Sequence, residues 1–126
     1  MADALAAWHR LVRENDAAAL EALLDEEAVF ISPVVHTPQL GRDKAALYLR
    51  GALRVLNNGA FRYVGEWHAP GSAVLEFEGR LGDIVVNGVD MIWWNDRGLI
   101  TRFKVMVRPL KGMEALRQAM AALLAT

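Results

Sequence analysis

The chain has 126 residues, of which 54% are hydrophobic and 23% charged, and its formal net charge is −1. This composition excludes a disordered chain and predicts one globular domain over residues 1–126. Its basic residues are scattered, so no nucleic-acid partner is expected, and without cysteine it has no disulfide or thiolate chemistry. No apolar run reaches the roughly 20 residues needed to span a bilayer, and the amino terminus lacks a signal-peptide pattern. We therefore expect a cytoplasmic protein with no membrane partner.

The first half of the chain carries mainly helical patterns. Apolar residues recur at spacings of three and four. Asp16 is placed to cap the second helix, and Asn57, Asn58 and Gly59 are placed to end the third. The predicted elements are helices over residues 4–12 and 17–24, a short strand over residues 28–31 and a helix over residues 41–56.

The second half changes to a period of two, which is typical of strands with one buried face. The predicted elements are strands over residues 61–68, 73–78, 84–94 and 99–107, followed by a helix over residues 110–123. Short turns make these strands antiparallel, and the helices can cover only one face of their sheet. Gly65, Gly79 and Gly88 permit strong bending within the strands. The order α-α-β-α-β-β-β-β-α therefore predicts an α+β fold, in which a cone-shaped, bent antiparallel sheet wraps around the helices and leaves a cavity.

Two stretches of the chain resemble a known family. The first includes Asn15 and Asp16, residues 22–29, Pro33, and Gly41 with Arg42, and the second is VDMIWWNDRGLI at residues 89–100. Both resemble nuclear transport factor 2-like (cystatin-like) domains, the superfamily of the SnoaL-like polyketide cyclases and the bacterial ketosteroid isomerases. The resemblance covers almost the whole chain and implies their cone-shaped fold, although this fold hosts many activities.

The same resemblance assigns three isomerase positions to residues of this chain. The general base of the isomerases, an aspartate before a proline, falls on Ser32, and their phenol donor falls on Trp8. Serine is no base near neutral pH without an activating partner, and an indole can donate a hydrogen bond but is no acid. The protonated aspartate of the isomerases falls on Asp90 and is retained. Steroid isomerisation by that mechanism is therefore not expected.

Two ionisable residues, Asp90 and His36, are the catalytic candidates. The resemblance points Asp90 into the cone, where desolvation favours the neutral acid that can donate a hydrogen bond to a carbonyl oxygen. The alternative is a structural carboxylate bonded to an indole or a tyrosine. His36 lies in a loop stiffened by Pro33 and Pro38, and the resemblance places this loop at the cavity rim, where an imidazole can act as a base. The alternative is a surface histidine or one bonded to the backbone.

Aromatic, aliphatic and hydroxyl side chains are the candidates for contact with a small hydrophobic ligand. These candidates are Trp8, Ser32, Val35, Tyr48, Tyr63, Trp67, Phe77, Ile92, Phe103 and Val105. Strand parity predicts that those on strands face the helices, and most of these are expected to be core. The histidines lack the spacing of metal ligands, and no phosphate-binding loop occurs, so neither a metal nor a cofactor is expected.

The strand of residues 84–94 is apolar on both parities, with Val89, Met91 and Trp93 opposite to Asp90. With helices on one face only, this second face would be exposed, and exposed apolar clusters usually mark interfaces. We expect a homodimer through the outer face of the sheet. The alternative is that the final helix folds over part of this face.

Two functions are compatible with these observations. The first is an isomerase, cyclase or dehydratase that acts on a hydrophobic carbonyl compound, with Asp90 as the acid and His36 as the base. The second is a non-catalytic module that binds a ligand or a protein. An enzyme needs the two side chains about 4 to 8 Å apart across an open cavity, whereas a binding module can hold Asp90 in fixed bonds and point His36 outward.

Overall fold

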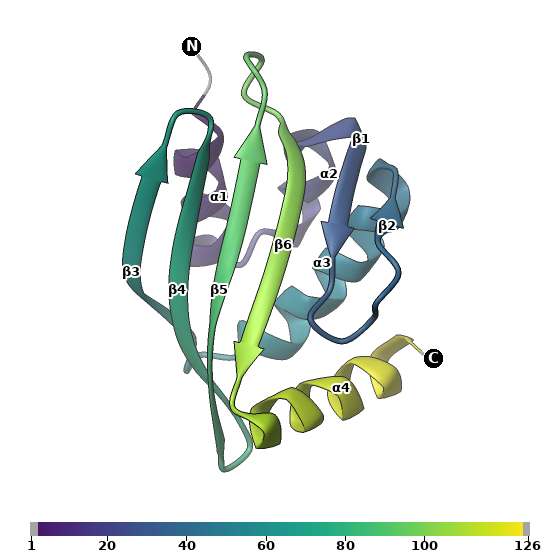
Figure 1. The fold of residues 1–126 in the computed structure, drawn as a ribbon, viewed down its shortest axis with the longest axis vertical. Helices are drawn as coiled ribbons and strands as arrows, with labels where there is room; N and C mark the ends of the chain where they lie inside the picture. Colours follow the sequence, from purple (N-terminus) through teal and green to yellow (C-terminus); the bar gives the residue numbers. More distant parts are fainter. Residues whose placement is uncertain (1–2, 125–126) are drawn as a thin grey trace.

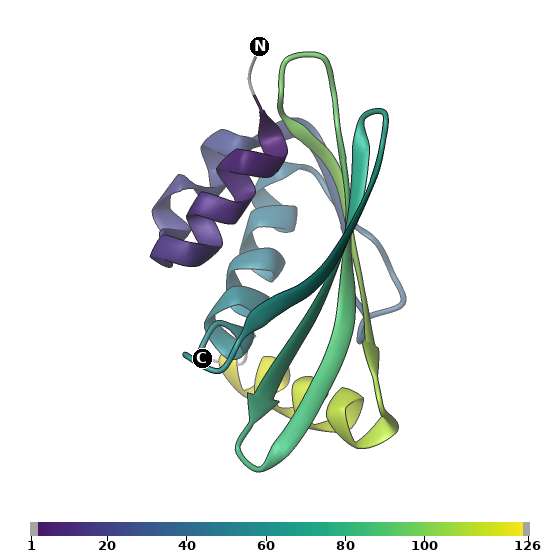
Figure 2. The ribbon, with the colours of Figure 1, turned by 90° about the vertical axis from the view of Figure 1, so that its left-hand side faces the viewer.

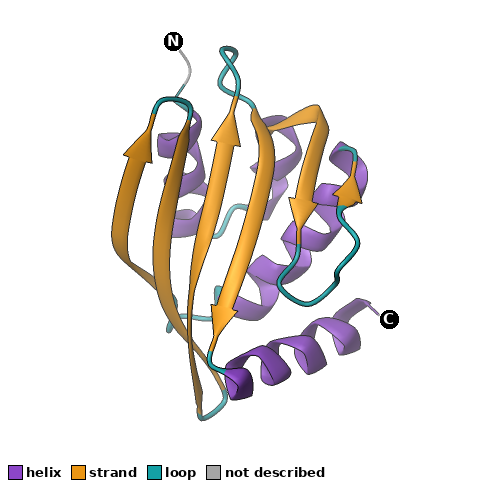
Figure 3. Ribbon diagram, in the orientation of Figure 1, coloured by secondary structure: helices purple, strands orange, loops and turns teal. Residues whose placement is uncertain are grey.

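The computed structural model describes residues 3–124, which form helices behind a six-stranded sheet (Figures 1 and 3). The elements are α1 (Ala4–Glu14), the 3₁₀ turn η1 (Ala17–Ala19), α2 (Leu20–Leu23), β1 (Leu24–Ile31), β2 (Gln39–Leu40), α3 (Arg42–Leu56), β3 (Arg62–Ala69), β4 (Ser72–Leu81), β5 (Ile84–Trp94), β6 (Ile100–Arg108) and α4 (Leu110–Leu124). The predicted α+β fold and its order of elements are confirmed. The two-residue strand β2, which directly follows Pro38, was not expected.

The strands lie in the order β2-β1-β6-β5-β4-β3. The four long strands β3 to β6 pair antiparallel, as their short turns require. β1 pairs parallel with β6, which makes the sheet mixed. A parallel pair needs a long connection between its strands, and here α3 and the four strands β2 to β5 lie between β1 and β6.

The helices α1, α2 and α3 cover one face of the sheet, and the sheet curves around them (Figure 2). Their apolar sides and the inward residues of the strands form one core. The largest fully buried side chains are Trp8, Phe30, Phe77, Phe103, Leu11, Leu20, Leu24, Leu75, Ile92, Ile100 and Val86. At about 25 cal/mol for each Å² of apolar surface removed from water, burial of these side chains is the main stabilising term of the fold.

Polar residues set the limits of α1. The Asp3 carboxylate accepts a hydrogen bond from the backbone N–H of Ala6, and Asn15 ends the helix with a left-handed backbone, at φ 52°. Asp16 was predicted to cap the next helix, but its side chain makes no capping hydrogen bond. The chain instead forms η1 before α2, and the strand β1 begins at Leu24, four residues earlier than predicted.

The edge strand β3 contains a bulge that reverses its side-chain alternation. Tyr63 pairs with Phe77, but Gly65 pairs with Glu76, so one extra residue is inserted between them. Beyond this point Glu66 pairs with the inward residue Leu75, and Trp67 lies on the outer face with 58% of its surface exposed. The predicted inward orientation of Trp67 is therefore wrong, because a strict period of two does not allow for the inserted residue.

The last helix, α4, closes one end of the helix-covered face (Figure 2). Its buried residue Leu116 lies beside Phe30, and Gly112 packs so tightly that an added Cβ would come within 2.8 Å of Val86. Both Phe30 and Val86 are inward residues. The alternative expectation, that this helix folds over the outer face, is therefore not met.

Candidate functional site

A cavity lies between α1, α3 and the inward face of the sheet. It contains about 330 Å³ of empty space, including some that is open to solvent, but the centres of water-sized spheres can reach only about 30 Å³ of it. Its walls are mostly apolar, and the lining residues are Trp8, Leu49, Ala52, Leu53, Leu56, Asn57, Phe61, Tyr63, Asp90, Phe103 and Val105. In this conformation the cavity is narrow, with one carboxyl group in an apolar wall.

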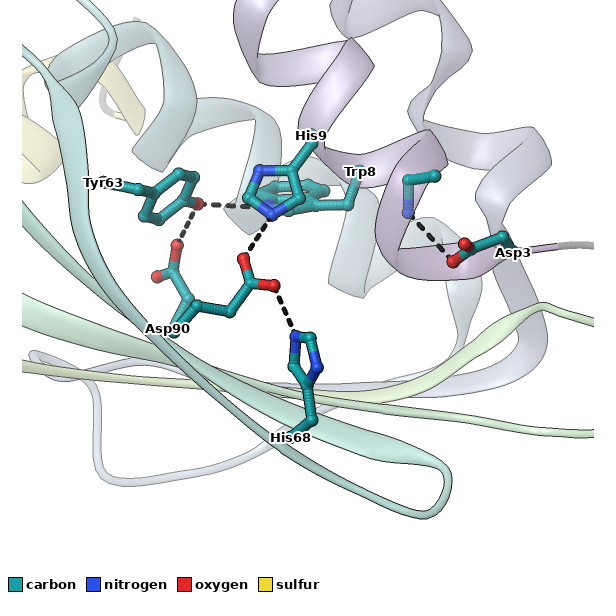
Figure 4. A network of polar contacts seen from close by, with 8 residues as sticks. Asp3, Trp8, His9, Tyr63, His68 and Asp90 are labelled. Atoms are coloured by element: carbon teal, nitrogen blue, oxygen red, sulfur yellow. Dashed lines mark hydrogen bonds and ion pairs between the residues drawn. The ribbon is translucent and has the colours of Figure 1, made fainter.

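Three of these residues form a chain of hydrogen bonds (Figure 4). The Tyr63 hydroxyl donates to Asp90 Oδ2 at 2.5 Å, and the Trp8 indole N–H donates to the same hydroxyl oxygen at 2.9 Å. The three side chains come from β3, β5 and α1, so the network joins the first helix to the middle of the sheet. Trp8 is held by an edge contact with the Phe103 ring, whose centroid lies 4.8 Å from its own.

Burial sets the ionisation of Asp90. The residue is 6% exposed, and desolvation raises the pKa of its carboxyl group to about 7, although the hydrogen bond from Tyr63 opposes this shift. Desolvation and the neighbouring Asp90 charge raise the pKa of the Tyr63 hydroxyl well above its usual value. Asp90 therefore changes its charge near neutral pH, while Tyr63 remains a neutral phenol.

Five of the predicted site residues line this cavity: Trp8, Tyr63, Asp90, Phe103 and Val105. Ser32 lines a second cavity, which shares Ala52, Leu56 and Val105 with the first and extends to α4. The Ser32 hydroxyl oxygen accepts hydrogen bonds from the backbone N–H groups of Val34 and Val35, so it shapes the loop. The roles proposed for these residues stay predictions.

The other predicted residues lie elsewhere. His36 and Val35 are exposed on the loop and line neither cavity, and Trp67 is on the outer face. Phe77 and Ile92 are fully buried core residues, and Tyr48 packs against the core from α3. The structure therefore does not bring His36 and Asp90 together across the cavity. The loop between Pro33 and Pro38 leaves the imidazole of His36 exposed.

A second polar cluster was missed by the sequence analysis. His9 Nε2 lies 2.7 Å from Glu66 Oε1, and His68 Nε2 bonds to the other oxygen of the same carboxylate (Figure 4). Desolvation raises the pKa of Glu66, but the bonds from His68 and His9 outweigh it, so the pKa is lowered. Strict alternation along the strand predicts Glu66 and His68 on the outer face, but the bulge places both on the inner face. The cluster could be predicted only if the bulge were recognised in the sequence.

The described residues 3–124 contain no group of three His, Asp or Glu side chains that could hold a metal ion. Over the same residues, every helix is too short or too polar to cross a bilayer.

Known structures share this architecture over nearly the whole chain. A steroid delta-isomerase from Pseudomonas aeruginosa is 39% identical, with a TM-score of 0.91, over 97% of this chain and 89% of its own. A protein with a cystatin-like fold from Silicibacter pomeroyi is 34% identical, with a TM-score of 0.89, over 100% of this chain and 88% of its own. Proteins named NTF2-like have the same fold. The chain belongs to the nuclear transport factor 2-like superfamily.

A SnoaL-like polyketide cyclase from Jannaschia sp. CCS1 shows how far this superfamily fold extends. It is 12% identical, with a TM-score of 0.70, over 90% of this chain and 91% of its own, so it shares the fold alone. No family model and no curated protein matches the sequence. The family assignment of this nuclear transport factor 2-like chain therefore rests on solved structures, and it agrees with the resemblance seen at residues 15–42 and 89–100.

Proposed function

We propose that this SnoaL-like protein binds a small, mostly apolar carbonyl compound in the cavity beside Asp90. The observation that carries the proposal is a buried carboxyl group, with its pKa raised to about 7, in a wall that is otherwise almost entirely apolar. Below that pH the neutral carboxyl group can donate a hydrogen bond to a carbonyl oxygen, and the apolar walls can pack against the rest of the ligand.

Binding without turnover is the function that the side-chain geometry supports best. Acid–base catalysis needs a base within reach of the ligand, and His36 is exposed outside the cavity. The family resemblance assigns the position of the isomerase base to Ser32, and the hydroxyl oxygen of Ser32 is engaged by two backbone N–H groups. Asp90 itself is held by Tyr63. These are the features expected of a binding module.

Isomerisation, cyclisation or dehydration is the second candidate, because a protein 39% identical to this chain is named a steroid delta-isomerase. In this function the neutral Asp90 would stabilise the enolate oxygen of a hydrophobic ketone, and His36 would have to reach the cavity as the base. The two candidates differ in a direct measurement, the exchange of the hydrogens next to the ketone for deuterium.

The binding of a bicyclic ketone such as 2-decalone, followed by calorimetry at several pH values, tests the proposal. We expect the association constant to fall about tenfold for each pH unit above about 7, because the ionised Asp90 can no longer donate to the carbonyl oxygen. The variant Asp90→Asn should show no such pH dependence, and His36→Ala should behave as the wild type.

A pH-independent association constant in the wild type, or no binding at all, would contradict the proposed function. Deuterium exchange that is catalysed by the wild type and lost in both Asp90→Asn and His36→Ala would instead establish the catalytic candidate. His36→Ala is the matched control for binding because this side chain lines neither cavity.

We also propose that the protein forms a homodimer through the outer face of the sheet. Apolar side chains are exposed there, including Trp67 at 58%, Met106 at 46% and Val85 at 55%, and none of the helices α1 to α4 covers this face (Figure 2). The guanidinium of Arg102 lies over the Trp93 ring, 4.9 Å from its centre, in a cation–π contact.

Sedimentation at micromolar concentration tests the dimer. We expect a dimer for the wild type and a monomer for the double variant Trp67→Glu with Met106→Glu, since two buried carboxylates facing their symmetry mates would be strongly unfavourable. Leu47→Glu is the matched control, because Leu47 is 52% exposed but lies on α3. A monomeric wild type would contradict the proposed dimer.

A further inference from the structure

The hydroxyl group of Tyr63 occupies the polar end of the cavity. Its oxygen lies between two partners from other elements, accepting from the Trp8 indole N–H and donating to Asp90. The bonds from Trp8 Nε1 and to Asp90 Oδ2 therefore meet at this single oxygen atom. The Trp8 N–H and one oxygen of Asp90, which together could recognise a ligand oxygen, are therefore already engaged by Tyr63.

We propose that Tyr63 is an internal competitor, whose phenol occupies the position of the ligand's oxygen and must be displaced before a ligand with a phenol or enol hydroxyl group, or a ketone, can bind. This inference rests on the proposed function and specifies how the same site selects its ligand. Tyr63 would then set both the affinity of the cavity and the kind of oxygen that it accepts.

The size of the cavity supports this inference. Only about 30 Å³ is accessible to the centres of water-sized spheres, which is too little for a two-ring ligand, and Tyr63 is one of the lining residues. Rotation of its phenol ring away from Asp90 would enlarge the cavity at its polar end. The narrow cavity is therefore the closed form of the binding site, in which Tyr63 fills the place of the ligand.

The surroundings of Tyr63 allow such a rotation more readily than the middle of the sheet would. The residue lies on β3, an edge strand that pairs only with β4, next to the bulge before Gly65. Its ring makes edge contacts with two side chains, Phe61 at 5.1 Å and His9 at 5.4 Å between centroids. His9 is itself about one-third exposed, so the wall behind the ring is not closed core.

The chemistry of the two partners defines the oxygen that can replace the phenol. The Trp8 N–H always donates, so the ligand oxygen must accept. Asp90 accepts when it is ionised and can donate when it is neutral, and its pKa is raised to about 7. A ketone therefore satisfies both partners only below this pH, whereas a phenol or enol, which both donates and accepts, satisfies them on either side of it.

The experiment compares 2-naphthol, which carries a phenol oxygen, with 2-methylnaphthalene, which has the same shape without it. The variant Tyr63→Phe removes the competing hydroxyl group and its two hydrogen bonds, so we expect it to bind both ligands at least about tenfold more tightly than the wild type, because either ligand must displace the ring. In each protein 2-naphthol should bind more tightly than 2-methylnaphthalene, because only its hydroxyl group can replace the phenol of Tyr63. Tyr48→Phe is the matched control, since Tyr48 is the other tyrosine of the chain and lines neither cavity.

A second measurement uses the wild type and needs no variant that might fold poorly. With only two tyrosines, labelling them with ¹³C at Cζ gives two resonances, which Tyr48→Phe assigns. Addition of 2-naphthol should shift the Tyr63 resonance, because its hydroxyl loses both hydrogen bonds, and should leave that of Tyr48 in place.

The outcomes separate this inference from the proposed function. Equal 2-naphthol affinities in wild type and Tyr63→Phe, with an unshifted Tyr63 resonance, would overturn the inference and leave ligand binding intact. Weaker binding to Tyr63→Phe would also overturn it, because Tyr63 would then assist the ligand. Failure of both naphthalenes to bind either protein would contradict the proposed cavity function as well.

Discussion

Asp90→Asn should remove a large pH dependence from the free energy of unfolding. In the folded protein burial raises the pKa of Asp90 from 3.8 to about 7. Between these values the folded state binds a proton that the unfolded state has lost, so stability falls as the pH rises and becomes level above about 7. The difference of about three pKa units corresponds to about 4 kcal/mol. This stability is complete below pH 3.8 and is lost as the pH rises through 7.

Denaturant unfolding of both proteins from about pH 4 to about pH 8 measures this effect. Asp25, Glu66 and Glu114 have lowered pKa values, so their contributions have the opposite sign and are lost at acid pH in both proteins alike. The difference between wild type and Asp90→Asn therefore isolates Asp90. Two parallel stability profiles would show that Asp90 is not desolvated. The proposed hydrogen bond from a neutral Asp90 to the ligand would then be contradicted as well.

The second large effect is expected at Gly88, in the middle of β5. A Cβ atom at this position would lie 2.4 Å from the backbone oxygen of Met106 and 2.6 Å from the ring of Phe77, which is fully buried. Neither atom can move without shifting the sheet, so we expect Gly88→Ala to lower the free energy of unfolding by about 3 kcal/mol. The corresponding fall in Tm is roughly 10 °C.

Gly65→Ala is the matched control for this prediction, because a Cβ there would also be crowded, at 2.8 Å from the Trp67 ring. Trp67 is 58% exposed and its ring can rotate away, so the loss should stay below about 1 kcal/mol. Thermal unfolding monitored by circular dichroism compares the two variants. Similar losses of stability in both variants would show that close contact of Gly88 with Met106 and Phe77 is not required for the stability of the sheet.

The fold could be predicted from local patterns because most of its elements follow simple periods. The alternation of Ala73, Leu75 and Phe77 gives three buried residues, and α3 ends at Leu56, directly before the asparagine and glycine signal. The start of β1 was missed because Asp25, Glu26 and Glu27 are unusual strand residues, and pairing with β6 outweighs their low propensity.

The candidate site was only partly predictable, for reasons of geometry. The family resemblance predicted that Asp90 points into the cone, and the structure places it on the helix-covered face, where β5 keeps a regular register with β4. The partner of Asp90 could not be identified, since sequence spacing does not show that Tyr63, 27 residues away, reaches it. His36 depends on the path of an irregular loop, and loop geometry is set by contacts such as those of Ser32 with the backbone.

The bulge in β3 links two surfaces that would otherwise vary independently. The inserted residue turns Trp67 toward the proposed subunit contact. It also places Glu66 and His68 on the opposite face, where Glu66 contacts His9. Deleting that residue would exchange the faces of these side chains. Trp67 would then point toward the helices and would no longer be available for the proposed subunit contact. The proposed dimer contact and the charged cluster beside α1 therefore both depend on the length of this single strand.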